Sequence, residues 1–258
     1  METIETIFKH RSIRKFTDNP ISDETVINIV KAGQRAPSAC SLQSYTIIWV
    51  KNEDKRKKLW ESCGRQDWIL EAPVIFTICA DIRKHIKMMN VLGFISSFEE
   101  GLGIRWKIFS IIDAILVAQN MTIAAESFGL GSIYIGGAIA NERVIKTLEL
   151  PKGVFPLSLL CIGWPDEDPT MRPRLPISNI LFVDKYKDLT KKELNDSIQH
   201  MVEKFKEENY YFKYGMGSME YTWIDNLKSK ITPNIKDDEK LKKILKKIGY
   251  TFDEPIKL

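Results

Sequence analysis

A short basic segment near the start of the chain, residues 10–16 (HRSIRKF), surrounds one apolar residue with cations and a hydroxyl. In an extended backbone successive side chains alternate, so Ser12 and Arg14 point to the side opposite Ile13. The guanidinium groups of Arg11 and Arg14 are suited to forked hydrogen bonds with phosphate oxygens. The segment is therefore a candidate phosphate site that packs Ile13 inward. A solvated basic turn is the alternative interpretation.

A second pair of arginines lies in residues 171–176 (MRPRLP), where Arg172 and Arg174 flank Pro173. Proline restricts the backbone dihedral φ, so this stretch loses little conformational entropy when it orders. The two guanidinium groups can therefore be aimed at an anion at low entropic cost.

A glycine pair, Gly136-Gly137, directly follows the apolar stretch 131–135 (GSIYI), which predicts a strand. Without Cβ atoms the backbone can come close to a flat ligand. Such a pair also occurs in ordinary turns, so its meaning depends on what surrounds it.

These segments need a scaffold, and the stretch Ile108–Phe128 predicts its central helix. Apolar residues recur there at spacings of three and four, and Gly129 follows, where a left-handed residue often ends a helix. Asp113, Gln119 and Glu126 interrupt the apolar run, which argues against a membrane span. A helix that is apolar on so many sides needs cover from the rest of the chain or from a second copy.

The remaining pattern predicts an α+β or three-layer α/β fold in which helices predominate. Residues 81–107 read as irregular, either as an aromatic lid over a pocket or as ordinary packing, and 209–217 as a mobile loop. Strands are predicted at 45–50, 74–80, 131–135 and 157–162, and helices at 2–9, 23–35, 52–63, 108–128, 141–148, 191–207, 221–231 and 238–248.

The composition is that of a globular protein. The 258 residues are 44% hydrophobic and 28% charged, with a net charge of +4. This mild excess of positive charge is enough for an anionic cofactor and is weak support for nucleic-acid binding. Cys79 and Cys161 lie in apolar runs and are expected to be buried thiols, and no metal-ligand spacing is present. The start lacks a signal-peptide pattern, so a cytoplasmic enzyme is expected.

Taken together, several motifs in this order resemble those of the FMN-dependent nitroreductase superfamily, and most closely its NADPH-dependent nitroreductase and flavin-reductase subgroup. They cover roughly residues 4–230, and their order is more specific than any one of them. The motifs are His10-Arg11-Ser12-Ile13-Arg14, Pro37-Ser38 with Gln43, Gln66, Ala118-Gln119-Asn120, Tyr134-Ile135-Gly136-Gly137, Leu160-Cys161-Ile162-Gly163-Trp164-Pro165 and Arg172-Pro173-Arg174-Leu175-Pro176.

The resemblance implies an α+β three-layer sandwich: a mostly antiparallel sheet flanked by helices around a central hydrophobic helix. It also implies an intertwined homodimer with FMN at the subunit interface. Residues 1–258 would form one FMN-binding domain, with 81–107 as an active-site excursion and 232–258 as a C-terminal docking helix and tail.

The resemblance also implies roles for individual residues around the phosphate and ribityl chain of FMN. Arg11, Ser12, Arg172 and Arg174 would hold the phosphate, and His10 would help to position it. The neighbouring Ile13 and Pro173 belong to the same two motifs.

Around the flavin ring, Arg14 would approach the N1–O2 edge and Gln66 the pyrimidine edge. The backbone of Gly136 or Gly137 would face N5, at the end of the Tyr134-Ile135 strand. Ser38 and Ala39 would reach the flavin from the partner subunit. No acid or base residue is expected, because hydride transfer needs none.

The function implied is that of an NAD(P)H oxidoreductase, with NADPH or NADH as reductant and a nitroaromatic, quinone or flavin as acceptor. The alternative is a flavin-binding or flavin-storage protein without turnover. Neither a nucleic-acid nor a membrane partner is expected.

Overall fold

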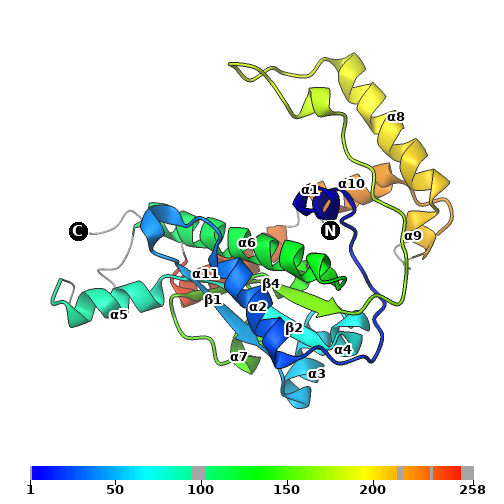
Figure 1. Cartoon of the computed structure of the whole chain (residues 1–258). Coiled ribbons are helices and arrows are strands. Elements are labelled where there is room, and N and C mark those ends of the chain that lie inside the picture. Colours follow the sequence, from blue (N-terminus) through cyan, green and yellow to red (C-terminus); the bar gives the residue numbers. More distant parts are fainter. Residues whose placement is uncertain (1, 95–102, 214–217, 233–234, 251–258) are drawn as a thin grey trace. The chain divides into compact units, whose positions relative to one another are not determined.

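The computed structural model describes residues 2–94, 103–213, 218–232 and 235–250. The chain divides into two compact units, each of which is considered by itself (Figure 1). The first comprises Met1–Pro169 with Lys236–Leu258, and the second comprises Thr170–Ile235.

The first unit is built on a four-stranded sheet in the order β1-β2-β4-β3, and every neighbouring pair is antiparallel. All eight residues of β2 are buried, as expected for a central strand covered on both faces. The predicted antiparallel sheet is confirmed, although β4 is longer than the predicted strand 157–162. The strands are β1 (Tyr45–Trp49), β2 (Val74–Asp81), β3 (Gly131–Ile135) and β4 (Val154–Gly163).

Helices cover both faces of this sheet, which gives three layers (Figure 1). Strand alternation divides the core: Phe76 and Leu160 pack with one helical layer, and Ile75 and Cys161 with the other. The first layer holds α2 (Asp23–Gln34), α6 (Ile104–Ser127) and α11 (Ile235–Ile248); the second holds α3 (Glu53–Ser62), α4 (Trp68–Glu71) and α7 (Glu142–Thr147). The unit also contains α1 (Thr3–Phe8), η1 (Ala39–Ser41), α5 (Arg83–Val91) and η2 (Gly136–Ala138).

Capping side chains account for where several helices begin. The side chains of Ser22, Asn52 and Asn141 accept hydrogen bonds from backbone N–H groups in the first turns of α2, α3 and α7. These starts agree with the predicted ones.

The expectation that 81–107 is irregular was wrong in part, because α5 occupies Arg83–Val91 and α6 begins at Ile104. The Asp81 carboxylate accepts hydrogen bonds from the backbone N–H groups of Arg83 and Lys84, which stabilises the start of α5. Residues 95–102, in the middle of the predicted active-site excursion, lie outside the described residues.

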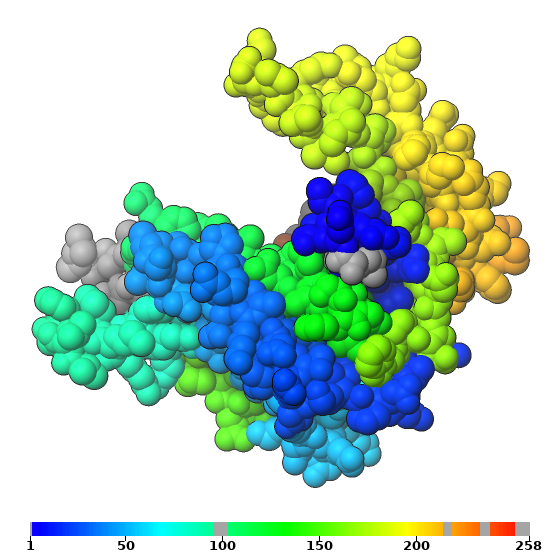
Figure 2. Space-filling model, viewed as in Figure 1, coloured from blue at the N-terminus to red at the C-terminus, as the bar shows by residue number. Residues whose placement is uncertain are grey.

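Helix α6 has two different apolar faces. Its inner face packs so closely on α2 that a Cβ added to Gly33 would lie 2.6 Å from Cγ of Met121. Its outer face carries an exposed apolar stripe. Figure 2 shows atoms of this part of the chain, in green, at the surface beside the blue atoms of α2. The stripe consists of Ile108, Ile112, Ile115 and Leu116, each between 37% and 55% exposed. The helix is long and apolar enough to cross a membrane by composition, but its burial on one face is that of a core helix.

The second unit is mainly helical, with η3 (Ile177–Asn179), α8 (Lys191–Glu207), α9 (Tyr210–Lys213) and α10 (Trp223–Ile231). A capping box between Thr190 and Glu193 starts α8 at the predicted residue. The prediction of a mobile loop over 209–217 was wrong for 210–213, which are helical, and 214–217 lie outside the described residues. Aromatic packing explains this helix: the ring centroids of Tyr210 and Tyr211 lie 5.2 Å from that of Phe205.

The buried carboxylate of Asp113 in α6 generates a prediction about stability. It accepts hydrogen bonds from the backbone N–H of Ala39 (2.9 Å) and of Ser44 (3.1 Å). Asp113→Ala should lower the free energy of unfolding by about 2–4 kcal/mol, because the buried N–H of Ser44 and the partly buried N–H of Ala39 lose a charged partner. Urea denaturation measures this loss. Glu61→Ala, at an exposed position of α3, is the control and should change stability by less than about 0.5 kcal/mol; an equally small change for Asp113→Ala would contradict the account.

Candidate active site

The basic segment 10–16 runs beside β3 at Ser12, and Phe16 forms a bridge with Pro165. Ser12 forms a parallel bridge with Ser132, and the backbone N–H of Ile13 donates to the carbonyl of Ser132 at 2.9 Å. Ile13 is buried and fits against Gly131, where a Cβ would lie 2.5 Å from its Cγ1. The basic residues are therefore fixed beside the strand that leads into the glycine pair.

His10 is held by a carboxylate from α6. Its Nδ1 lies 2.7 Å from Oε1 of Glu126, and the same oxygen accepts a hydrogen bond from the Ser132 hydroxyl at 3.1 Å. The carboxylate thus joins the basic segment, the long helix and β3. The sequence predicted no partner for Glu126; the available signal was a carboxylate that interrupts the apolar run of a core helix.

The two arginines of this segment have different surroundings. Arg11 forms an ion pair with Asp168, whose side chain is 81% exposed, so the pair faces solvent. Arg14 lies over the ring of Trp68, with 5.8 Å between Cζ and the ring centroid. Its backbone N–H donates to the carboxylate of Glu167 at 2.5 Å. An anion that binds Arg11 would compete with an exposed carboxylate, which is a weak competitor in water.

The glycine pair forms an exposed turn at the end of β3. A Cβ on Gly136 would have no heavy atom within 4 Å, whereas one on Gly137 would lie 3.3 Å from Cα of Cys63. The first N–H groups of such a turn have no acceptor within it. The turn therefore presents bare backbone outward while it rests on the end of α3.

Gln66 lies near the glycine turn, just after the end of α3. Its side-chain Nε2 donates to the carbonyl of Cys63 at 2.7 Å, so Gln66 and Gly137 both contact one residue. Burial raises the pKa of the Cys63 thiol to about 11, so this sulfur remains protonated at neutral pH.

Tyr134 connects β3 to α6. The Thr122 hydroxyl donates to the Tyr134 hydroxyl at 3.0 Å, while 38% of the tyrosine stays exposed. Burial of the hydroxyl raises the pKa of Tyr134 to about 12, so it is a neutral hydrogen-bonding group at physiological pH. The next residue, Ile135, is buried in the core.

Ser38 and Ala39 lie in a tight loop that follows α2. The Ser38 hydroxyl accepts a hydrogen bond from the Gln43 N–H at 3.3 Å, and Asp113 holds Ala39. Cys40 and Ser41 have positive φ values of 50° and 58°, a conformation that non-glycine residues rarely adopt without outside support. The loop is therefore fixed on α6.

Arg172 and Arg174 belong to the second unit, whereas Arg11 and Ser12 belong to the first. Arg172 pairs with Glu208 at 2.9 Å and lies 3.7 Å from the centroid of the Tyr210 ring. Arg174 donates to the backbone carbonyls of Arg172 and Pro173, at 3.1 and 3.2 Å. Within its own unit each guanidinium already has contacts that fix the segment's conformation.

Known proteins resemble this chain in sequence and in fold. Residues 7–164 match the Nitroreductase family. The chain is 33% identical to the oxygen-insensitive NADPH nitroreductase of Salmonella typhimurium, covering 88% of this chain and 89% of that protein. It is 36% identical to an FMN reductase [NAD(P)H] of Bacillus subtilis, covering 88% and 90%. The structure of the hypothetical oxidoreductase YcnD from Bacillus subtilis superimposes with a TM-score of 0.86 at 33% identity, covering 98% and 100%.

The three-layer α+β sandwich places the chain among enzymes of nitroreductase fold. The chain belongs to the nitroreductase family. The family resemblance and the fold class predicted from the sequence are thereby confirmed.

The geometry of the glycine turn predicts that its two residues tolerate a methyl group differently. Gly137→Ala should lower the free energy of unfolding by about 1–3 kcal/mol, because the new methyl presses on the backbone of Cys63. Gly136→Ala should change it by less than about 0.5 kcal/mol, since the methyl meets open space. Chemical denaturation of both variants measures the difference. Equal stabilities would show that the turn does not rest on α3 as described.

Proposed function

We propose that the chain is an FMN-dependent NAD(P)H oxidoreductase that reduces a small nitroaromatic, quinone or flavin. One observation carries this proposal: the bridge between Ser12 and Ser132 places the basic segment beside the strand that ends in the bare glycine turn. A phosphate-bearing, flat cofactor needs those two features together. The names of the relatives, an NADPH nitroreductase and an FMN reductase [NAD(P)H], support the same class of enzyme.

The residues present fit FMN. Arg11 and Ser12 supply a cation and a hydroxyl for the phosphate, and His10 is held close to them by Glu126. The open space over Gly136 would admit the edge of a ring. We assign phosphate binding to Arg11, Ser12, Arg172 and Arg174, with His10, Ile13 and Pro173 fixing the conformation of these segments.

For the ring, we assign the N5 contact to the backbone of Gly136 or Gly137 and the pyrimidine contact to Gln66. Arg14 would lie at the N1–O2 edge, where a positive charge stabilises the negative charge gained on reduction. Tyr134 and Ile135 hold the glycine turn at the end of β3. Ser38 and Ala39 would contact the flavin bound to the other subunit.

When bound, FMN would supply the redox chemistry, that of hydride acceptance and electron donation. The protein binds and orients both reactants and excludes water from them. It also supplies fixed charges and backbone dipoles.

Colour tests the proposal against its alternative, a flavin carrier without turnover. The purified protein should be yellow, and NADPH or NADH should bleach it when oxygen is absent. Admission of a quinone should restore the colour. A yellow protein that neither reductant bleaches would be a carrier, and a colourless protein that binds no added FMN would contradict both.

The proposed phosphate contact makes Arg174→Ala a test of residue assignment. Loss of one charge-assisted contact should raise the dissociation constant for FMN about 10- to 150-fold, or about 1.5–3 kcal/mol. Fluorescence titration of the apoprotein with FMN measures the constant. Lys192→Ala, an exposed cation in α8 of the same unit, is the control. Unchanged affinity in Arg174→Ala would remove Arg174 from the site.

We also propose a homodimer with FMN at the subunit interface, because the outer stripe of α6 is apolar and exposed in the single chain. An obligate interface buries more than about 2,000 Å², and such a stripe would lie at its centre. Light scattering should give about twice the chain mass of 29.8 kDa.

Ile115→Glu should convert the dimer to monomers and weaken FMN binding, because a charge in an apolar interface is unpaired. Leu70→Glu, an equally drastic change at a partly exposed leucine in α4, should leave the mass unchanged. An FMN-loaded wild-type monomer would contradict the dimer. We also propose that the protein is cytoplasmic and that its other partners are small-molecule electron acceptors.

A further inference from the structure

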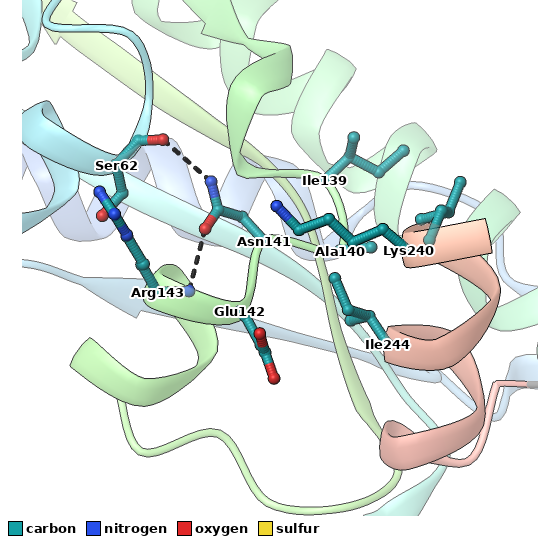
Figure 3. Close-up of a pocket in the computed structure, with 9 residues that line it drawn as sticks. Ser62, Ile139, Ala140, Asn141, Glu142, Arg143, Lys240 and Ile244 are labelled. Carbon is teal, nitrogen blue, oxygen red and sulfur yellow. Dashed lines mark hydrogen bonds between the residues drawn. The ribbon is translucent and has the colours of Figure 1, made fainter. Parts of the chain in front are cut away.

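One asparagine, Asn141, joins the glycine turn to two helices. Its side-chain Nδ2 donates to the carbonyls of Ser62 and Gly137, both at 2.9 Å. Its Oδ1 accepts from the N–H groups of Arg143 (3.0 Å) and Val144 (3.4 Å) at the start of α7. Figure 3 shows the carboxamide between the end of α3 and the start of α7. Because two carbonyls lie on one side and two N–H groups on the other, only one orientation of the amide satisfies all four.

The end of α3 supports the glycine turn, Gln66 and Asn141 together. Ser62, which accepts from Asn141, precedes Cys63, which lies under Gly137 and accepts from Gln66. Asn141 therefore binds the glycine turn to the same piece of backbone that positions Gln66.

The turn needs such support for two reasons. Two successive glycines leave the backbone unusually free to rotate. In addition Ala140 has a φ of 45°, a left-handed conformation that is unfavourable for a residue with a side chain. The hydrogen bond to the Gly137 carbonyl restricts this freedom, beside the backbone bond from Ile139 to Gly136. The bonds to Ser62 and α7 fix the residue next to Ala140, whose own N–H donates to Pro156.

We propose that Asn141 is a positioning residue for hydride transfer: it fixes the backbone of Gly136 and Gly137 at the place where that backbone faces flavin N5. The inference rests on the proposed function. It assigns to Asn141 an effect on the properties of bound flavin that an ordinary helix cap does not have.

Two substitutions separate the donor role from the cap role. Asn141→Asp keeps an oxygen to cap α7 but replaces the amino group with an oxygen that faces two carbonyls. Asn141→Ser keeps a good capping hydroxyl that is too short to hold the turn, and it introduces no repulsion. The matched control is Asn52→Asp, because Asn52 caps α3 in the same way through the N–H of Lys55.

The measurements are the visible absorption spectrum and reduction potential of bound FMN, the dissociation constant for FMN, and the rate of anaerobic flavin reduction by NADPH. Both Asn141 variants should shift the spectrum and the potential and slow reduction at least about tenfold, since small misplacements of reacting groups can cost up to about 100-fold. Asn52→Asp should match the wild type in all four. If both Asn141 variants lost FMN while Asn52→Asp retained it, that result would also support the inference.

Wild-type spectra, potentials and rates in the two Asn141 variants would overturn the inference. Unfolding of both variants would also overturn it, because Asn141 would then have only a structural role. A wild-type protein that binds no FMN would instead overturn the proposed function, so the two failures are distinguishable.

Discussion

Three polar side chains on helix α6, the buried Asp113 and Thr122 and the largely buried Glu126, hold the segments that surround the candidate site. Asp113 binds the loop after α2, Thr122 binds Tyr134, and Glu126 binds His10 and Ser132. A buried polar group costs free energy unless it has a hydrogen-bond partner. The helix can therefore pack on the sheet only when these segments are in place, and the segments gain their conformation from the same packing.

The close fit between α6 and α2 makes this arrangement stiff. Gly33 leaves just enough room for Met121, so the helix cannot slide along its neighbour without a clash. The glycine turn at the end of β3 is supported separately, by Cys63 below and by Asn141 beside it. The basic segment and the bare glycine turn are thus held by different elements of one compact unit. Such fixed positions suit an enzyme whose own contribution is position and charge.

Much of the fold could be predicted because its signals are local. Ser22, Asn52 and Thr190 cap helices through bonds three residues away, and the start of each helix follows from that spacing. The start of α5 was missed because no capping residue stands directly before it: its N-cap is Ile82, and the carboxylate that binds its first N–H groups belongs to Asp81, the last residue of β2.

The site could be predicted only in outline. Motif order predicted which segments would bind the cofactor, and the structure places one of them, residues 10–16, beside β3. The partners of Glu126 and Asn141 could not be predicted, because His10 lies 116 residues from Glu126, and Ser62 lies 79 residues from Asn141. Local patterns carry no information about such pairs. The exposed stripe on α6 was ambiguous for a related reason, since an apolar face does not specify whether the same chain or another copy covers it.

The crystal structure of the protein grown with FMN tests the central claim most directly. The account predicts that flavin N5 lies within hydrogen-bonding distance, about 3 Å, of the backbone N–H of Gly136 or Gly137. It also predicts that the phosphate contacts Arg11 and Ser12. A flavin bound away from the glycine turn, or a phosphate that contacts neither residue, would contradict the account.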